Sequence, residues 1–412
     1  MTLRIAIVGG GLAAALFLRK AGLDATVYEQ APELREIGAG IVVPPNMVRP
    51  LGALGLADKL QSFAVRIEAA WEFRRWEDGR VLFVQPMGEQ CERLYGAHCY
   101  VAHRAELLAL FQQALPPQLL RLDQRCVKVS QDEHEVELAF CSSAGQEATV
   151  TADVVIGADG IHSSVRQAVA PNINARFSRL SVFRCLVPAN KAPKMALRPV
   201  QTLWLGPGRH FVLYPISGGR LINVVAVVPA GDWRTESWIA DGEISDLTRE
   251  FEGWDDRLHQ LIRSASETKR WALYDRDSLA RWTEGGVSLL GDAAHAMFPF
   301  LAQGAAQAIE DAVVLADCLR AADRSSARHA LLRYEEIRRP RASRVQLMSR
   351  GMGGVDHLPD GPEQRQRDAE FADGDPLRRS AWLYGHDVAA DAPKQKGQLT
   401  LNETNGSIAG PS

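Results

Sequence analysis

The chain has 412 residues, of which 46% are hydrophobic, and a formal net charge of −3. This length supports a large core and more than one simple domain. The small negative charge excludes the basic field with which proteins bind nucleic acid or anionic membranes. No apolar run approaches the roughly 20 residues of a membrane span, so we expect neither nucleic acid nor a membrane as a partner.

The six cysteines show no C-x-x-C or other metal-ligand spacing, so we expect no metal site. Unpatterned cysteines are typical of a reduced compartment. The first residues form an apolar strand pattern instead of a charged region before a signal core. We therefore expect a cytoplasmic protein.

The first 30 residues have the order of a dinucleotide-binding βαβ unit. Strand, glycine turn, helix, second strand and acid are expected at Leu3 to Val8, Gly9 to Gly11, Leu12 to Ala21, Ala25 to Tyr28 and Glu29. Glycines let the backbone approach a pyrophosphate, the helix start stabilises its charge, and the acid binds ribose hydroxyls. An ordinary βαβ unit would share this order, so both interpretations stay open at this point.

The middle of the chain alternates short strands and helices. Strands are expected on both sides of the Glu77–Gly79 turn, at Arg125 to Ser130, at Glu135 to Phe140 and at Asp153 to Ile156, with a helix from Ala105 to Ala114. Asp159-Gly160 predicts a tight turn after the last strand. Ser163 and Ser164 can cap the helix that follows.

From Phe183 the pattern changes to strands without long helices between them. They are expected at Phe183 to Val187, Gln201 to Leu205, His210 to Ile216 and Leu221 to Val228. We infer an antiparallel sheet that forms a second, substrate-binding domain. His210 and Tyr214 share one face of a strand and can bind a phenol or carboxylate, or move its proton. A structural histidine would satisfy the same spacing.

The segment from Val287 to Asp311 is the strongest functional signal. An apolar strand ends at Gly291-Asp292, a loop with Pro299 and Gly304 follows, and an alanine-rich helix begins at Ala305. In an open α/β sheet, ligands bind where strands end and helices begin. A carboxylate beside a helix N-terminus suits a ligand with polyol and negative charge, such as a reduced flavin with its ribityl chain. The next helix, Ala327 to Leu347, is expected to be interrupted near Pro340.

Three clusters stand in one order: GGG near the start, GADGIHSSVR in the middle, and GDAAHAMFPFLAQGAAQAIEDA late. Together they resemble the FAD-dependent aromatic hydroxylases, the single-component flavoprotein monooxygenases. The segments GAGI with PPN, HRAELL, HFVLYP, HLPDGPEQ and WLYGHD resemble the branch of salicylate hydroxylase and 6-hydroxynicotinate 3-monooxygenase. The resemblance covers about residues 1 to 390, and it is the combination that is specific.

The resemblance implies an α/β fold with an additional antiparallel sheet. Residues 1–65, 100–180 and 275–350 would form a discontinuous, Rossmann-like FAD-binding domain, and 66–99 with 181–274 the sheet domain for substrate. Residues 351–392 would form C-terminal helices, and 393–412 a disordered tail.

The resemblance also assigns roles to residues. Glu29 would bind the adenosine ribose, Arg104 would contact FAD, Asp159 would serve FAD and the nicotinamide nucleotide, and Asp292 would bind the ribityl chain. Pro299 would line the flavin, and the helix start at Gly304 and Ala305 would face its pyrimidine edge. The remaining FAD contacts would be Gly9, Gly11, Leu12 and Gln30, while His210 and Tyr214 would face the substrate as catalytic residues.

The implied reaction is hydroxylation of a small phenolic or heteroaromatic acid, such as salicylate or a hydroxybenzoate. NADH or NADPH would reduce FAD, O2 would form a flavin C4a-hydroperoxide, and one oxygen atom would pass to the ring. A larger aromatic natural-product intermediate is an alternative substrate, and a homodimer stays open. Some pyridine-hydroxylating relatives carry histidine where this chain has Val42, which argues against hydroxynicotinate.

One departure from the family pattern concerns the glycine turn. Leu12 follows Gly11 directly, as if three residues including the third glycine of G-x-G-x-x-G were missing, although Ala14 can fill the third position. A loss of three residues would pull the helix start back by nearly a turn. An alternative function is therefore a relative with impaired FAD binding and weak or no activity.

Overall fold

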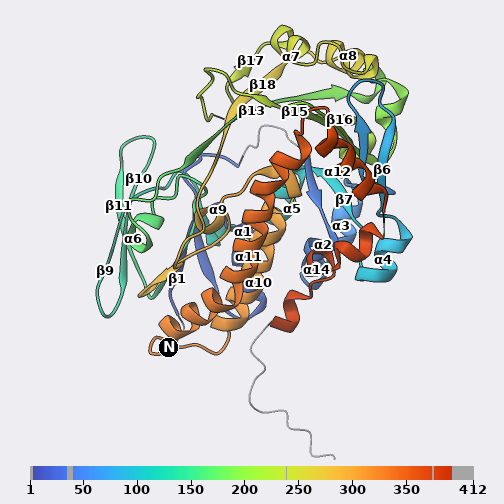
Figure 1. The fold of residues 1–412 in the computed structure, drawn as a ribbon. Coiled ribbons are helices and arrows are strands. Elements are labelled where there is room, and N and C mark those ends of the chain that lie inside the picture. The colour runs from blue at the N-terminus through green and yellow to red at the C-terminus, as the bar shows by residue number, and fades with distance from the viewer. Residues whose placement is uncertain (1–2, 35–39, 238, 374, 392–412) are drawn as a thin grey trace, which may run out of the picture.

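The structure is a computed structural model that describes residues 3–34, 40–237, 239–373 and 375–391. The segment expected to be a disordered tail, 393–412, lies outside these described residues. Figure 1 shows one body in which a bundle of long helices and a large sheet meet.

The first large sheet has the strand order β19-β20-β12-β1-β2-β8. All neighbours are parallel except the pair β19–β20. Its central strands are buried along their whole length, as in sheets covered on both faces. The strands are β1 (Ile5–Gly9), β2 (Ala25–Tyr28), β8 (Leu120–Arg121), β12 (Val154–Ala158), β19 (Thr283–Glu284) and β20 (Val287–Leu289). The expected βαβ unit is therefore confirmed.

Three helices pack together beside this sheet (Figure 1): α1 (Leu12–Lys20), α10 (Gly304–Leu319) and α11 (Ala327–Asp356). The expected interruption of the last helix at Pro340 is wrong, because α11 runs through it. Tyr334 and Arg338 before the proline and Ala342 after it are buried. Packing on both sides of Pro340 thus outweighs the backbone hydrogen bond that proline removes.

A three-stranded meander projects from the body in Figure 1. Two of its strands, β9 (Arg125–Gln131) and β10 (Val136–Cys141), were expected from the sequence. The third, β11 (Glu147–Ala152), is exposed along its first three residues, so it lacks the apolar alternation by which a half-buried strand is recognised.

The second large sheet has the order β17-β18-β13-β16-β15-β14-β5-β6. Its strands are β5 (Ala69–Arg75), β6 (Val81–Pro86), β13 (Arg176–Pro188), β14 (Val200–Gly206), β15 (Arg209–Ile216), β16 (Leu221–Pro229), β17 (Asp241–Gly242) and β18 (Thr268–Asp275). The four strands expected between Phe183 and Val228 pair antiparallel, as predicted. The sheet continues beyond them, and there β14 and β5 run parallel. Only strands joined by tight turns must be antiparallel, and β5 reaches β14 through a long connection.

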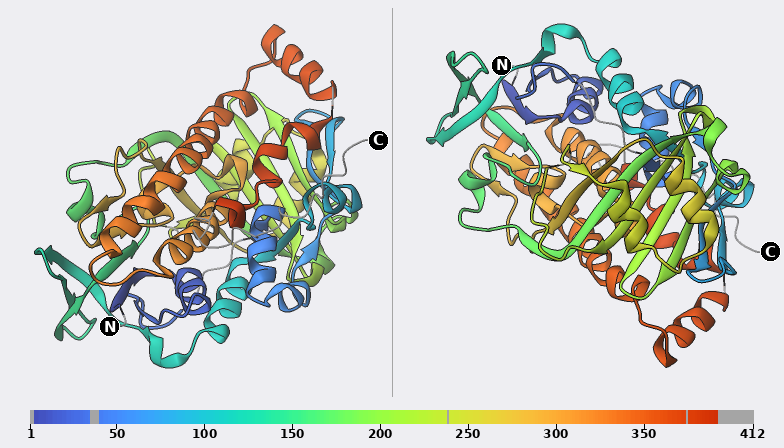
Figure 2. Two further views of the ribbon diagram at one scale, coloured as in Figure 1. Left: turned by 90° about the horizontal axis from the view of Figure 1, so that it is seen from below. Right: turned by 90° about the horizontal axis from the view of Figure 1, so that it is seen from above.

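Helices α7 (Ile244–Glu250) and α8 (Asp256–Arg263) cover the outer face of this sheet, as the right-hand view of Figure 2 shows. A small antiparallel sheet consists of β3 (Gly40–Val43), β4 (Val65–Arg66) and β7 (Tyr100–His103). The remaining elements are α2 (Pro45–Ala53), α3 (Ala57–Gln61), α4 (Glu89–Tyr95), α5 (Arg104–Ala114), α6 (Arg166–Val169), α9 (Asp292–His295), α12 (Pro362–Ala372), α13 (Pro376–Arg379), α14 (Ala381–Tyr384), η1 (Pro117–Leu119), η2 (Ala189–Lys191), η3 (Lys194–Leu197), η4 (Ser217–Gly219), η5 (Pro299–Leu301) and η6 (Val388–Asp391).

Candidate active site

The carboxyl ends of the parallel strands meet at one edge of the first sheet. Aligned pairs at this edge are Gly9 with Ala158, Val8 with Tyr28, and Gly157 with Leu289. The residues that follow the strand ends are Glu29, Asp159 and Asp292, so the register brings these three predicted carboxylates to the same edge as Gly9. Ligands of open α/β sheets bind at such an edge.

The glycine turn fits tightly between β1 and β12. Gly9 has φ +95°, and a Cβ there would lie 2.4 Å from the carbonyl oxygen of Ala158. A Cβ on Gly11 would lie 2.6 Å from Cγ2 of Ile7. Both positions therefore require glycine for packing, whether or not a nucleotide is bound.

The backbone N–H groups of this turn point at the chain itself. The N–H of Gly11 donates to the Gly9 carbonyl at 2.8 Å, and the N–H of Leu12 donates to the Gly10 carbonyl at 2.9 Å. Helix α1 begins directly at Leu12, whose side chain is buried. The early helix start expected from the sequence is confirmed, and it leaves fewer donors for a pyrophosphate than an open glycine loop offers.

Glu29 lies beside the glycine turn. A Cβ on Gly10 would lie 3.7 Å from its Oε2, while Oε1 accepts a hydrogen bond from the Ala31 N–H at 2.8 Å. Gln30 is exposed next to it, and Arg104 is the exposed first residue of α5. The contacts of Gln30 and Arg104 with FAD stay predictions.

Asp159 presents an unused acceptor. Its Oδ2 accepts from the Ser164 N–H (2.7 Å), the Ser164 Oγ–H (3.0 Å) and the Val165 N–H (3.2 Å). Its Oδ1 is buried and has no hydrogen-bond partner among the described residues. A buried acceptor without a donor is costly, so Oδ1 suits a hydroxyl of a bound ligand. The N-cap residue of α6 is Val165, which makes no side-chain cap. Of the two serines expected to cap this helix, Ser163 accepts a hydrogen bond at its Oγ from the N–H of Arg166, the first helical residue.

The second half of the site is the segment from Asp292 to Ala305. Asp292 is the exposed first residue of α9, and Pro299 is exposed in η5. Helix α10 begins at Gly304, one residue before the expected start, and no side chain caps it. The first N–H groups of an uncapped helix, together with its dipole, stabilise negative charge on a ligand.

A buried charge network that the sequence did not reveal lies beneath this segment. Asp311 contacts His295 Nε2 at 2.6 Å and Arg338 Nε at 2.8 Å, and it accepts from the Gly291 N–H at 3.0 Å. Arg338 also binds Glu310 at 2.8 Å. The only sequence signal was two consecutive acids inside the apolar run of α10. Asp311 thus holds the backbone N–H of Gly291, the residue before Asp292, and restrains the backbone that leads into Asp292.

The network keeps its acids ionised. Burial raises the pKa of Asp311, but the charges of His295 and Arg338 outweigh it, so the pKa lies below the usual value. Burial likewise raises the pKa of Glu310, and Arg338 with Arg341 brings it below its usual value. Ionised buried acids require these cations, because an unpaired buried charge is strongly unfavourable.

The described residues fit a flavin dinucleotide. The buried Oδ1 of Asp159 can accept a hydrogen bond, and Glu29 lies beside the glycine turn. Asp292 is exposed, and the space next to Gly304 is open, since a Cβ there would meet nothing within 4 Å. The contracted glycine turn fits less well, because its N–H groups at Gly11 and Leu12 already donate to backbone carbonyls.

The inner face of the second sheet is the candidate substrate face. Along β15, Phe211 and Leu213 pack beneath α7 and α8, whereas Val212 and Tyr214 belong to the cluster on the other side. That cluster includes residues from the loop around η5: Met297, Leu301 and Ala302. The predicted residues Tyr214 and His210 therefore face the segment that contains Pro299.

A polar row crosses this inner face, and two of its members were missed from sequence. Tyr214 pairs with Asn223, and the register of β14 with β15 places Gln201 on its other side. Gln201 Oε1 and Asn223 Nδ2 are buried, and neither has a hydrogen-bond partner within the described ranges. Alternation alone does not mark them, since only strand pairing aligns three strands.

Arg184 adds a buried positive charge to this face. Burial raises the pKa of Tyr214, and the charge of Arg184 opposes that rise. Tyr214 therefore stays protonated at neutral pH and can donate a hydrogen bond.

His210 is buried at the opposite end of the strand from Tyr214. Its ring lies edge-on to Phe300 with centroids 5.4 Å apart, and its Nδ1 lies 2.7 Å from Nε2 of His357. Burial holds the pKa of His210 well below its ordinary value. A neutral imidazole at this position can accept a proton.

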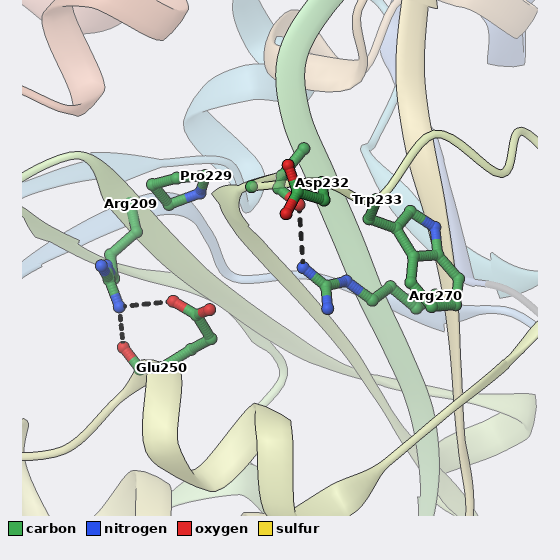
Figure 3. A pocket seen from close by; sticks show the side chains of 8 residues that line it. Arg209, Pro229, Asp232, Trp233, Glu250 and Arg270 are labelled. Carbon is green, nitrogen blue, oxygen red and sulfur yellow. Dashed lines mark hydrogen bonds and ion pairs between the residues drawn. The ribbon is translucent and has the colours of Figure 1, made fainter.

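Figure 3 shows an open hollow of about 660 Å³ elsewhere on the second sheet. Arg209 is paired with Glu250 there at 2.8 Å, and Arg270 lies beside Trp233. The hollow contains none of the predicted flavin or substrate residues. The candidate active site is therefore the region between the carboxyl edge of the first sheet and the inner face of the second sheet.

The described part of the chain has neither a metal-binding cluster nor a membrane-spanning helix. No group of three or more histidine, cysteine, aspartate or glutamate side chains is arranged to hold a metal ion. No helix there is both long enough and apolar enough to cross a membrane.

Residues 2–349 match the family model of the FAD binding domain. The chain belongs to this family. The 3-amino-4-hydroxybenzoate 2-monooxygenase PtmB3 of Streptomyces platensis is 42% identical over 94% of this chain and 96% of its own length. The 6-hydroxynicotinate 3-monooxygenase of Bordetella bronchiseptica is 34% identical over 84% of this chain and 90% of its own length. The chain is thus a flavoprotein aromatic monooxygenase whose cofactor is FAD, as the resemblance implied.

Solved structures agree with the fold. A substrate complex of salicylate hydroxylase superposes with a TM-score of 0.80 at 28% identity, covering 95% of this chain and 97% of the other. Klebsiella pneumoniae HpxO complexed with FAD and uric acid gives 0.80 at 27% identity, with 95% and 97% coverage. The expected aromatic hydroxylase fold is confirmed.

Proposed function

We propose that this monooxygenase hydroxylates an aminohydroxybenzoate, with 3-amino-4-hydroxybenzoate as the first substrate to test. The observation that carries the proposal is the polar row of Gln201, Tyr214 and Asn223. The acceptor Gln201 Oε1 is buried without a donor, and an aromatic amino group supplies one. The relatives named for this substrate are 42% identical to the chain over nearly its full length.

The chain's own residues prepare the ring for oxidation. Bound FAD, reduced by NADH or NADPH, supplies the chemistry that activates O2. Neutral His210 accepts the proton of the substrate hydroxyl, which makes the ring more electron-rich. Arg184 stabilises the negative charge of the acid on the same face, and Tyr214 donates a hydrogen bond. Phe300 and Val212 exclude water from the reacting atoms.

A substrate panel tests the activity. FAD-loaded enzyme is offered 3-amino-4-hydroxybenzoate, 4-hydroxybenzoate, salicylate and 6-hydroxynicotinate with NADH and with NADPH. O2 uptake and the mass gain of one oxygen in the product are measured. We expect the highest kcat/KM with the aminohydroxybenzoate; faster coupled turnover of a substrate without the amino group would refute the assignment.

Two variants test the residue roles. His210→Ala should keep bound flavin and lose about 10²- to 10⁴-fold in turnover, since it removes the base. Gln201→Leu should lose more kcat/KM for the aminohydroxybenzoate than for 4-hydroxybenzoate. Gln260→Leu, at an exposed position on α8, is the control and should change neither. Equal losses on both substrates with Gln201→Leu would remove the proposed amino contact.

The cytoplasm is our proposed location. All six cysteines lie in the described residues and are free, and four of them are buried, as is usual for reduced thiols in a reducing compartment. Fractionation of the producing cells checks this placement.

A further inference from the structure

His357 contacts His210 from outside the second sheet. Their ring centroids lie 4.9 Å apart, and His210 Nδ1 and His357 Nε2 are separated by 2.7 Å. Such a contact is attractive only when one nitrogen carries the hydrogen and the other a lone pair. The tautomers of the two rings are therefore coupled.

Several contacts fix His357 in this place. It caps the C-terminus of α11, and its backbone carbonyl accepts a hydrogen bond from the Gly208 N–H at 3.0 Å. Its ring also lies 6.1 Å from Phe300, the residue that stands edge-on to His210. His357 thus links the end of the longest described helix to the strand that presents the substrate residues.

Burial, and to a lesser extent nearby charge, keeps both rings neutral. Burial, together with the nearby charge of Arg209, lowers the pKa of His357 to about 4. Asp356 precedes it in the chain, and burial raises the pKa of that carboxyl to about 7, opposed by Arg367. Burial and His357 both lower the pKa of His210. Each ring therefore carries one hydrogen at neutral pH.

We propose that His357 is a positioning residue that holds His210 with its hydrogen on Nδ1, so that Nε2 keeps a lone pair for the substrate hydroxyl. The inference rests on the proposed role of His210 as the base. The substrate O–H bond breaks, its proton binds Nε2 of His210, and the electron pair stays on the phenolate oxygen. The Nδ1–H donated to His357 stabilises the imidazolium that results.

The opposite arrangement gives a different chemistry. If His357 Nε2 carried the hydrogen, His210 would accept it at Nδ1 and carry its own hydrogen on Nε2. His210 could then only donate to the substrate. The acceptor on His357 is therefore the feature to test.

Three variants of the FAD-loaded enzyme separate these cases. His357→Phe removes the acceptor, His357→Gln retains an acceptor oxygen, and His329→Phe changes an exposed histidine on the same helix as a control. The measurements are the pH profile of kcat/KM and the pH at which bound 3-amino-4-hydroxybenzoate ionises, read from near-ultraviolet difference spectra. The second readout does not depend on turnover.

For His357→Phe we expect about a 10²-fold loss in kcat/KM and a rise of at least one unit in the pH of substrate ionisation. His357→Gln should stay within about fivefold of the parent, and the control should match it. Unchanged ionisation in His357→Phe, or equal damage in His357→Gln, overturns the inference. Should His357→Phe fail to fold, His357→Met makes the same test.

His210→Gln distinguishes a failure of the proposed role of His210 from a failure of the inference about His357. If it leaves substrate ionisation unchanged, the proposed role of His210 fails, and the inference fails with it. If it shifts ionisation while His357→Phe does not, the role of His210 stands and only the inference about His357 fails.

Discussion

The two ends of the proposed FAD site are built in opposite ways. At the glycine turn, the N–H groups of Gly11 and Leu12 are consumed by carbonyls two residues back. At the other end, no side chain caps the start of α10. The N–H of Gly291, just before Asp292, is bound by the buried carboxylate of Asp311.

This difference predicts where the affinity for FAD resides. Asp292 and the first N–H groups of α10 are available to a ligand without rearrangement. The contracted glycine turn, in contrast, must open before its N–H groups can bind the pyrophosphate. We therefore expect the segment from Asp292 to Ala305, which we call the flavin end, to contribute most of the binding free energy of FAD. The affinity for FAD should be lower than with a full glycine loop.

Arg338→Met should destabilise the protein most. It leaves Glu310 and Asp311 buried without their shared cation, and such a loss costs about 3–5 kcal/mol. The check is the midpoint of urea unfolding of the apo-protein. Arg333→Met, at an exposed position on the same helix, is the control and should change the unfolding free energy by less than about 0.5 kcal/mol. Equal midpoints for both variants would show that the network does not support the flavin end.

Acid should weaken the same network. The folded-state pKa values of Glu310 and Asp311 lie below their ordinary values, so their stabilising contribution is complete above about pH 5 and is lost as pH falls through the folded-state values. The unfolding free energy, measured between pH 6 and pH 3, should therefore decline with acid. Asp311→Asn should flatten that decline, and Asp58→Asn, an exposed control, should not. A decline of the same slope in Asp311→Asn would contradict the prediction.

Asp292→Ala should lower the affinity for FAD by roughly 10- to 100-fold, because a charged hydrogen bond contributes about 1.5–3 kcal/mol. Titration of the visible flavin spectrum measures the Kd. Asp232→Ala, in the hollow of Figure 3, is the control and should bind FAD like the parent. A parental Kd in Asp292→Ala would remove the carboxylate from the ribityl contact.

Insertion of Ile-Gly-Gly between Gly11 and Leu12 should give the smallest change, about a tenfold tighter Kd for FAD. The longer turn frees the donors that Gly11 and Leu12 now direct at the chain, and two hydrogen bonds of about 0.7 kcal/mol each account for a tenfold change. The same insertion after Gly145, in the β10–β11 turn, is the matched control. Unchanged or weaker binding at the first site would mean that the contracted turn is adapted to FAD as it stands.

Sequence patterns predicted the central features for physical reasons that are local. Apolar runs followed by glycine or an acid marked β1, β12 and β20, and one periodicity change marked the strands of the second sheet. The pattern failed at Pro340, where buried neighbours carry the helix onward, and it did not reveal that a distant strand pairs with β14 in parallel.

The site divides in the same way. The motif residues Gly9, Glu29, Asp159 and Asp292 could be predicted from the sequence, because each lies at or just after a strand end that is recognisable in the chain. Only the tertiary structure brought Asp311 under Gly291 and His357 against His210, since these contacts join segments 20 and 147 residues apart. Local spacing encodes the ends of strands, whereas the partner of a buried charge or ring is chosen by how separate elements pack.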